Sequence, residues 1–150
     1  MEKESIPVQK AISMREAIPL TEYVYIGVVG GTAYAFLEIL WRGYTHWSMI
    51  VAGMLAAMFL YWCGVMLVAR PLWLRCLVGA LGITAVEFAI GCVVNLWWQL
   101  GVWDYSALPG NVLGQICPLF TGIWCGLCIP AYWLCGVIRR AWHMAMHGEG

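Results

Sequence analysis

The sequence predicts an all-α, polytopic integral membrane protein with four transmembrane helices. Hydrophobic residues make up 63% of the chain and charged residues 11%, whereas soluble domains are nearer one half and one quarter. Four apolar runs are each long enough to cross the ~30 Å hydrocarbon core of a bilayer. The connections between these runs are short, so we expect the spans to form one small bundle.

The elements follow from these runs in chain order. We expect the spans over about residues 23–41, 47–69, 76–100 and 112–138. Residues 1–22 form a polar, cytoplasmic N-terminal arm, which the pattern fits either as a short interfacial helix or as a loosely ordered tail. Residues 139–150 form a short cytoplasmic tail.

The connections predict how the spans meet. Little more than a Gly-Tyr-Thr-His segment separates the first two spans, so they should form a tight antiparallel hairpin. Gly53 and Ala57 on the second span are a small pair four residues apart, which lets a neighbouring helix approach closely. Pro118 and Pro130 fall inside the fourth run, and we expect both to bend it.

The basic residues predict the orientation. With the N-terminus inside, the inner segments carry Lys3, Lys10, Arg15, Arg70, Arg75, Arg139 and Arg140. The outer segments then carry only Arg42. By the positive-inside rule both termini are expected in the cytoplasm. Because the net charge is zero, nothing indicates the basic surface that nucleic-acid binding requires.

Glu87 is the most unusual residue of the third span. An acidic side chain at membrane depth is costly and marks a candidate functional site. Gly91, Asn95 and Gln99 follow Glu87 at intervals of four, which predicts a slanted polar band on one helix. We expect Gly91 to leave room for a ligand or a neighbouring backbone. With no cation firmly placed beside it, Glu87 should hold a proton in the empty protein.

Under this orientation most polar groups at membrane depth lie in the outer half. This predicts a polar pocket open to the outer face, with Glu87 at its floor. The candidate ligand-binding residues are Glu38, Arg42, His46, Glu87, Asn95, Asp104, Tyr105, Asn111 and Gln115. The two glutamates would serve as counter-charge or proton acceptor. The alternative is a buried hydrogen-bond network that holds four helices together, with Glu38 and Arg42 as an ordinary ion pair four residues apart.

Aromatic and sulfur residues suggest further alternatives. Five tryptophans near the outer boundary predict an aromatic belt: Trp41, Trp47, Trp97, Trp98 and Trp103. The segment from Trp124 to Cys128, WCGLC, is similar to a thioredoxin-like CxxC site. Its apolar surroundings disfavour the thiolate that such chemistry needs, so we expect packing cysteines and keep a thiol oxidoreductase as an alternative. His143 and His147 have a spacing that suits a metal, but a solvated tail without metal is the expectation.

Several segments together resemble a known family. They are Glu38 with Arg42-Gly43, His46 to Met49, Glu87-Phe88 with Gly91 and Asn95, Trp103 to Ser106, Pro109, Asn111, and Gly114 to Ile116. This pattern is similar to the small bacterial membrane proteins described as putative ABC-transporter type IV, or putative ABC-transporter permease. The resemblance implies a multi-pass protein of the bacterial cytoplasmic membrane and a role in transport. It names no cofactor.

These observations lead to one expected function and, besides the thiol oxidoreductase, two alternatives. We expect recognition or transport of a small polar or cationic solute, without enzymatic activity. The alternatives are a membrane-embedded enzyme that uses an acid–histidine cluster at the outer surface, and a structural or accessory subunit. Four helices enclose little space, so a homo-oligomer or a partner membrane protein is expected within the bilayer. The chain has no phosphate-binding loop with lysine, so any ATPase would be a separate subunit.

Overall fold

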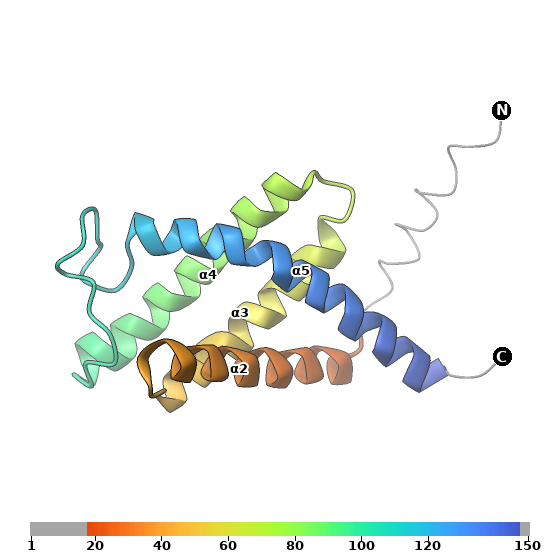
Figure 1. The fold of residues 1–150 in the computed structure, drawn as a ribbon, viewed down its shortest axis with the longest axis horizontal. Helices are drawn as coiled ribbons and strands as arrows, with labels where there is room; N and C mark the ends of the chain where they lie inside the picture. The colour runs from red at the N-terminus through yellow and green to blue at the C-terminus, as the bar shows by residue number, and fades with distance from the viewer. Residues whose placement is uncertain (1–17, 148–150) are drawn as a thin grey trace.

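The computed structural model describes residues 18–147 and confirms the all-α, four-span prediction. Its helices are α2 (Leu20–Arg42), α3 (Trp47–Met66), α4 (Leu72–Gly91) and α5 (Pro118–His147), and a π-helical turn η1 (Cys92–Trp97) continues α4 (Figure 1). All four spans are long and apolar enough to cross a membrane. Most of the predicted N-terminal arm, residues 1–17, lies outside the described part of the chain. The cytoplasmic placement of the termini stays a prediction.

The fourth helix differs from the predicted range at both ends. It begins at Pro118, not near residue 112, and it continues to His147 through most of the predicted tail. Proline suits the first turn of a helix because its missing N–H has no intrahelical partner there. Pro118 therefore starts the helix and does not bend it, which corrects the prediction, whereas Pro130 does lie inside. With 30 residues, α5 is about 45 Å long and extends past a single span.

Helices α2 and α3 form the predicted hairpin and pack through small residues. A Cβ atom added to Gly30 would lie 2.1 Å from the Cβ of Ala57, and one added to Gly53 would lie 2.6 Å from the Cβ of Tyr34. Real Cβ atoms do not approach so closely, so this interface depends on glycine. The close approach predicted from Gly53 and Ala57 is confirmed.

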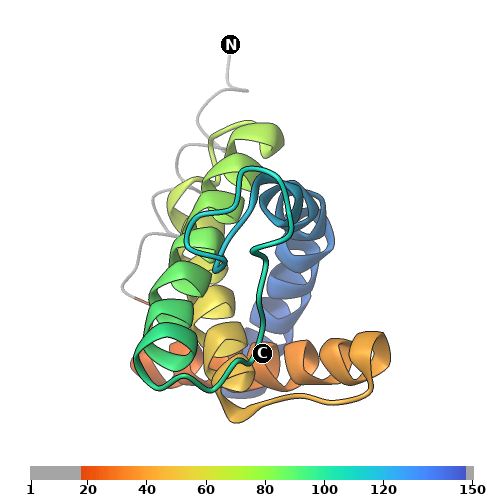
Figure 2. The same ribbon diagram turned by 90° about the vertical axis from the view of Figure 1, so that its left-hand side faces the viewer.

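The four helices are not packed evenly. Helix α2 packs mainly on α3, α4 packs on α3 and α5, and α2 meets α5 only sparsely. In Figure 1, α5 runs obliquely across the bundle and approaches α2 near the start of that helix. There the ring centroids of Tyr25 and Trp142 lie 5.2 Å apart. We call this end the terminal end and the opposite end, which carries residues 98–117, the loop end (Figure 2).

Candidate functional site

The loop of residues 98–117 is held against the end of α4 by the half-buried amide of Asn95 and the buried amide of Gln115. The backbone N–H of Val102 donates to Oδ1 of Asn95 over 2.7 Å, and Nδ2 of Asn95 donates to Oε1 of Gln115 over 2.8 Å. The indole N–H of Trp103 donates to the backbone oxygen of Gln115 over 3.0 Å. Asn95 lies in the π-helical turn, a feature often found at functional sites. The side chains of Asn95 and Gln115, both predicted to bind a ligand, are thus hydrogen-bonded within the protein itself.

Gly91 provides the space that this loop occupies. A Cβ at Gly91 would lie 2.5 Å from Oε1 of Gln115 and 3.0 Å from the ring of Trp103. The room predicted for a ligand or a backbone is therefore filled by two loop side chains. Gln99 lies beyond the helix, exposed and with a positive φ of 55°. The predicted polar band on the third span therefore ends at Asn95.

Glu38 and Arg42 form the predicted ion pair and also reach the loop. Nη2 of Arg42 lies 2.7 Å from Oε1 of Glu38, and the hydroxyl of Thr45 donates to Oε2 of Glu38 over 2.6 Å. Nη1 of Arg42 donates to the backbone oxygen of Val102 over 3.0 Å. Arg42 thereby connects the end of α2 to the same loop residue that Asn95 holds from α4.

His46 serves as the N-cap of α3. Its Nδ1 accepts a hydrogen bond from the backbone N–H of Ser48 over 3.3 Å and lies 2.8 Å from the Ser48 hydroxyl. A side chain that accepts from the first turn satisfies one of the free N–H groups of a helix start. This nitrogen is therefore engaged in capping, and the geometry does not favour an acid–histidine catalytic pair.

Asp104 and Asn111 shape the loop. The carboxylate of Asp104 is exposed and accepts from the hydroxyl and from the backbone N–H of Ser106, and these hydrogen bonds lower the pKa of Asp104. Nδ2 of Asn111 donates to the backbone oxygen of Leu108 over 2.8 Å, and its Oδ1 accepts from the N–H of Gly114 over 3.0 Å. Both predicted residues are thus engaged within the loop itself.

Tyr105 packs the loop onto the start of α5. Its ring stacks on Phe120 with the centroids 4.4 Å apart and an interplanar angle of 14°. Burial raises the pKa of its phenol, and nearby negative groups add to the effect. The phenol therefore stays neutral at physiological pH.

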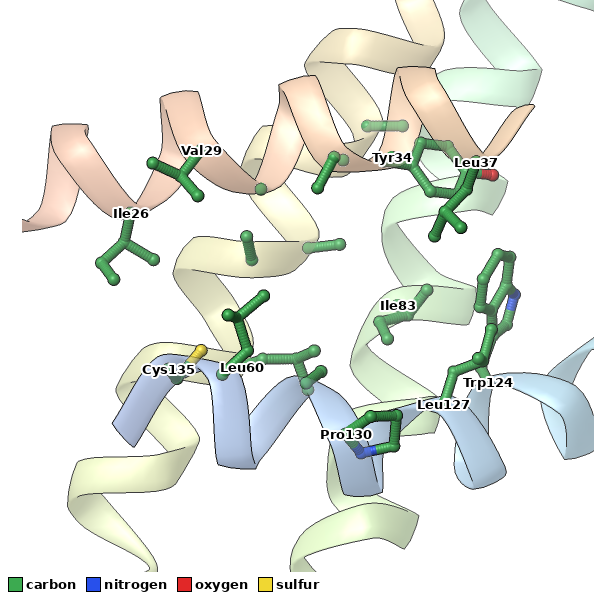
Figure 3. Close-up of a pocket in the computed structure, with 18 of the residues that line it drawn as sticks. Ile26, Val29, Tyr34, Leu37, Leu60, Ile83, Trp124, Leu127, Pro130 and Cys135 are labelled. Atoms are coloured by element: carbon green, nitrogen blue, oxygen red, sulfur yellow. The ribbon is translucent and has the colours of Figure 1, made fainter. Parts of the chain in front are cut away.

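A cavity of about 270 Å³ lies between α2 and α5, with α3 and α4 behind it (Figure 3). Small residues on α2 and α3 leave this space open: Gly30, Ala33, Ala52, Gly53, Ala56 and Ala57 all line it. Larger apolar residues from all four helices complete the wall. In the part of the chain that the structure describes, Glu87 is the one acidic or basic residue of the lining and the only predicted ligand-binding residue that reaches this cavity.

Glu87 is nearly enclosed, with only 4% of its surface exposed. Its Oε2 accepts a hydrogen bond from the indole N–H of Trp124 over 2.7 Å. Among the described residues, no hydrogen-bond donor contacts Oε1. The ring centroids of Tyr34 and Trp124 lie 5.9 Å apart, and Figure 3 shows both side chains at the same end of the cavity. The two aromatic residues were not predicted as site residues: Trp124 was noted only as part of the WCGLC segment, and nothing in the sequence places either residue beside Glu87.

Two other predictions concern sulfur and tryptophan. All seven cysteines are free, and Cys128 is fully buried where α3, α4 and α5 meet, so no disulfide supports the redox alternative. The described residues contain no group of three metal-ligating side chains, and the side chains of His143 and His147 lie outside the description. Trp103 is buried, with 8% of its surface exposed, and does not belong to the aromatic belt. The prediction for that tryptophan was wrong.

Comparison with known proteins gives one match. The family model described as "Putative ABC-transporter type IV" matches residues 23–147, which include all four spans and the loop between α4 and α5. No curated protein and no solved structure matches the chain.

Proposed function

The chain belongs to the putative ABC-transporter type IV family, and from this premise we propose that it is the membrane-spanning, solute-binding part of a transport system. In this proposal a small cationic solute binds in the cavity between α2 and α5, and Glu87 provides the counter-charge. The protein would reside in the bacterial cytoplasmic membrane with both termini inside. The polar residues of the loop end would position the loop and would not contact the solute.

The surroundings of Glu87 carry this proposal. The carboxyl group lies in an apolar cavity, and no basic side chain within the described part of the chain lines it. Trp124 satisfies Oε2, while Oε1 has no donor among the described residues. Burying a carboxylate without a counter-charge is costly. A proton offsets this cost in the empty protein, and a cation that enters the cavity would displace the proton and pair with the carboxylate.

A family named for ABC transporters suggests a partner ATPase, and the chain has no nucleotide-binding loop of its own. We propose that any ATPase contacts the terminal end. The turn between α3 and α4 covers only residues 67–71, whereas α5 continues to His147, past its candidate span Pro118–Trp142, and carries Arg139 and Arg140 near that end. The last turns of α5 therefore offer the larger surface. The exposed apolar faces of α2 and α5 are available for lipid or for a further membrane-protein copy.

Thermal stabilisation in nanodiscs tests the role of Glu87, because a ligand that binds only the folded state raises the melting temperature. A panel of ammonium compounds should stabilise the wild type. Glu87→Gln keeps the shape and the acceptor for Trp124 but removes the charge, so stabilisation should disappear. Glu38→Gln is the matched control, since Glu38 is a buried glutamate that does not line the cavity. Equal stabilisation of the wild type and Glu87→Gln would contradict the proposal.

The pH dependence gives a second test. A proton competes with the cation for Glu87, so the affinity for the cation should rise with pH in the wild type, whereas Glu87→Gln should show no binding that depends on pH. The other titratable groups that interact with Glu87 are the phenols of Tyr34 and Tyr105. Phenols titrate near pH 10 in water, so below about pH 9 both phenols stay neutral and do not contribute to the pH dependence of binding.

The satisfied network at the loop end favours one second candidate, an accessory subunit without a solute. In that case Glu87 only accepts from Trp124. Glu87→Gln would then behave as the wild type in every ligand and flux assay, and only Glu87→Leu, which removes the acceptor, would lower stability. Solute flux into liposomes, measured with and without a co-purified ATPase, separates the two candidates.

A further inference from the structure

We infer that the ligand is an amphipathic monocation with an apolar body of one or two rings, and that it enters sideways from the bilayer between α2 and α5. This inference rests on the proposed function, in which Glu87 binds a cation. It adds the substrate class and the route of entry. Three features of the cavity carry it: the chemistry of the wall, the volume, and the position of the opening.

The wall of the cavity selects against hydrophilic solutes. Apart from Glu87, the described lining residues carry two hydrogen-bonding side-chain groups, the Tyr34 hydroxyl and the indole N–H of Trp124. The indole N–H is already bonded to the carboxyl group of Glu87. The other lining residues are aliphatic, together with one proline and Cys135. A solute with several hydrogen-bonding groups would lose its water without replacement. An apolar body would gain by leaving water.

The volume and the charge limit the size and valence of the ligand. A cavity of about 150 Å³ can hold benzene, and drug-sized pockets begin near 300 Å³. At about 270 Å³ this cavity therefore suits one or two rings. Ile26 and Leu37 both line it and are eleven residues apart on α2, which corresponds to about 16 Å. With one carboxylate at one end, a second positive charge would have no partner.

The opening lies between two ring contacts that join α2 to α5. Tyr34 and Trp124 meet near the loop end, with 5.9 Å between ring centroids, and Tyr25 meets Trp142 at the terminal end. Beyond Glu87 towards the loop, Gly91 is covered by two side chains of the loop. Side chains thus cover the loop end of the cavity, and at the terminal end the contact between Tyr25 and Trp142 lies beyond the last lining residues, Ile26 and Ile138.

The side of the cavity between these contacts is bordered by exposed apolar residues. Leu37, Leu127 and Leu134 are 54%, 43% and 40% exposed and line the cavity from α2 and α5. Figure 3 shows Leu37 and Leu127 among the lining residues. On membrane-spanning helices such a rim faces hydrocarbon, not water. A solute dissolved in the bilayer can therefore reach Glu87 without crossing the packed loop.

Binding of three probes to the protein in nanodiscs tests the substrate class. We expect 1-naphthylmethylamine to bind and methylammonium not to bind. The neutral analogue 1-methylnaphthalene should bind at least about tenfold more weakly than the amine, a difference of roughly 1.4 kcal/mol in binding free energy. Ala56→Leu fills the floor of the cavity and should abolish binding of the amine. Ala33→Leu, at an exposed lining position that tolerates a larger side chain, gives the same test if Ala56→Leu does not fold.

The outcomes separate this inference from the proposed function. If methylammonium binds in a Glu87-dependent manner and the naphthyl amine does not, the proposed function stands and the substrate class is wrong. If no cation depends on Glu87, both are wrong. Equal binding of the amine and the neutral analogue, unchanged by Glu87→Gln, would identify a site for an acyl chain or another apolar group and overturn the inference.

The route of entry has its own measurement. Leu127→Trp places a larger side chain on the rim and should slow association of 1-naphthylmethylamine. Leu119→Trp is the matched control, because Leu119 is an exposed leucine of α5 that does not line the cavity. Equal association rates for the two variants, both folded as judged by their melting temperatures, would exclude entry between α2 and α5.

Discussion

Gly91→Ala tests whether the loop end is a packed structure or an open binding site. The added Cβ would lie 2.5 Å from Oε1 of Gln115, 3.1 Å from the Cβ of Gln115 and 3.0 Å from the ring of Trp103. Neither neighbour can move away freely, because Gln115 is 3% exposed and Trp103 is 8% exposed. Gln115 is also hydrogen-bonded to Asn95, and Trp103 to the backbone of Gln115. The substitution should therefore displace the loop.

The magnitude follows from opposing contributions. Alanine is favoured over glycine inside a helix by up to about 1 kcal/mol. Overpacking costs about 1–3 kcal/mol, and loss of the bond between Asn95 and Gln115 adds about 1 kcal/mol. The free energy of unfolding should therefore fall by about 1–3 kcal/mol. In an open polar site, by contrast, the substitution would be neutral or stabilising.

Reversible denaturation of the purified protein in detergent micelles measures this change. Gly126→Ala is the matched control, because Gly126 also lies inside a helix and a Cβ there meets no atom within 4 Å. Gly126→Ala should be neutral or stabilising. If Gly91→Ala and Gly126→Ala unfold at the same denaturant concentration as each other, the packing described for the loop end is wrong.

Three further predictions follow from the same contacts. Asn95→Leu leaves two buried loop partners unsatisfied and should lower the free energy of unfolding by about 2–4 kcal/mol, as measured by denaturation. The pKa of Asp104 should lie below its ordinary value of 3.8 and return towards 3.8 in Ser106→Ala, and an NMR titration measures both values. The stability that Asp104 contributes is fully present above the ordinary value and is lost as the pH falls through the lowered pKa. Replacing Cys125 and Cys128 together by alanine should leave any solute binding intact and lower the melting temperature only slightly. A Cys125–Cys128 disulfide in the purified, oxidised protein, together with quinone-dependent thiol oxidation, would restore the redox alternative.

The fold could be predicted because it depends on the length and composition of apolar runs. Such runs identify the spans, and the short connections require neighbouring helices to be antiparallel. The start of the fourth helix was misplaced because residues 112–117 are as apolar as the helix that follows. Hydropathy does not show that Asn111 and the positive φ of Gly114 turn this segment back on itself before Pro118.

The candidate site could be predicted only in part. The sequence singled out Glu87 because a carboxyl group inside an apolar run is visible without a structure. Tyr34 and Trp124 come from two other helices, and their place beside Glu87 depends on how α2 and α5 cross. The same holds for the cavity, since small residues are usually read as close packing. Here they close one interface, between Gly30 and Ala57, and leave space beside it.

The polar residues at membrane depth share a cause that the pocket hypothesis did not consider. A loop that folds back into the end of a bundle carries N–H and C=O groups away from water, and each needs a partner. Asn95 satisfies the N–H of Val102, Arg42 satisfies its oxygen, and Trp103 satisfies the oxygen of Gln115. The hydrogen bonds to the loop backbone therefore explain why these polar side chains are present.

Glu87 is not accounted for in this way. It has no hydrogen bond to the loop backbone in the described structure, and its one donor is a neutral indole on α5. If accepting from Trp124 were its whole role, a glutamine would serve equally and would avoid the cost of a buried acid. An acid is required only where a proton or a cation is exchanged. The comparison of glutamate with glutamine at position 87 is therefore the substitution that separates a transport role from a purely structural one.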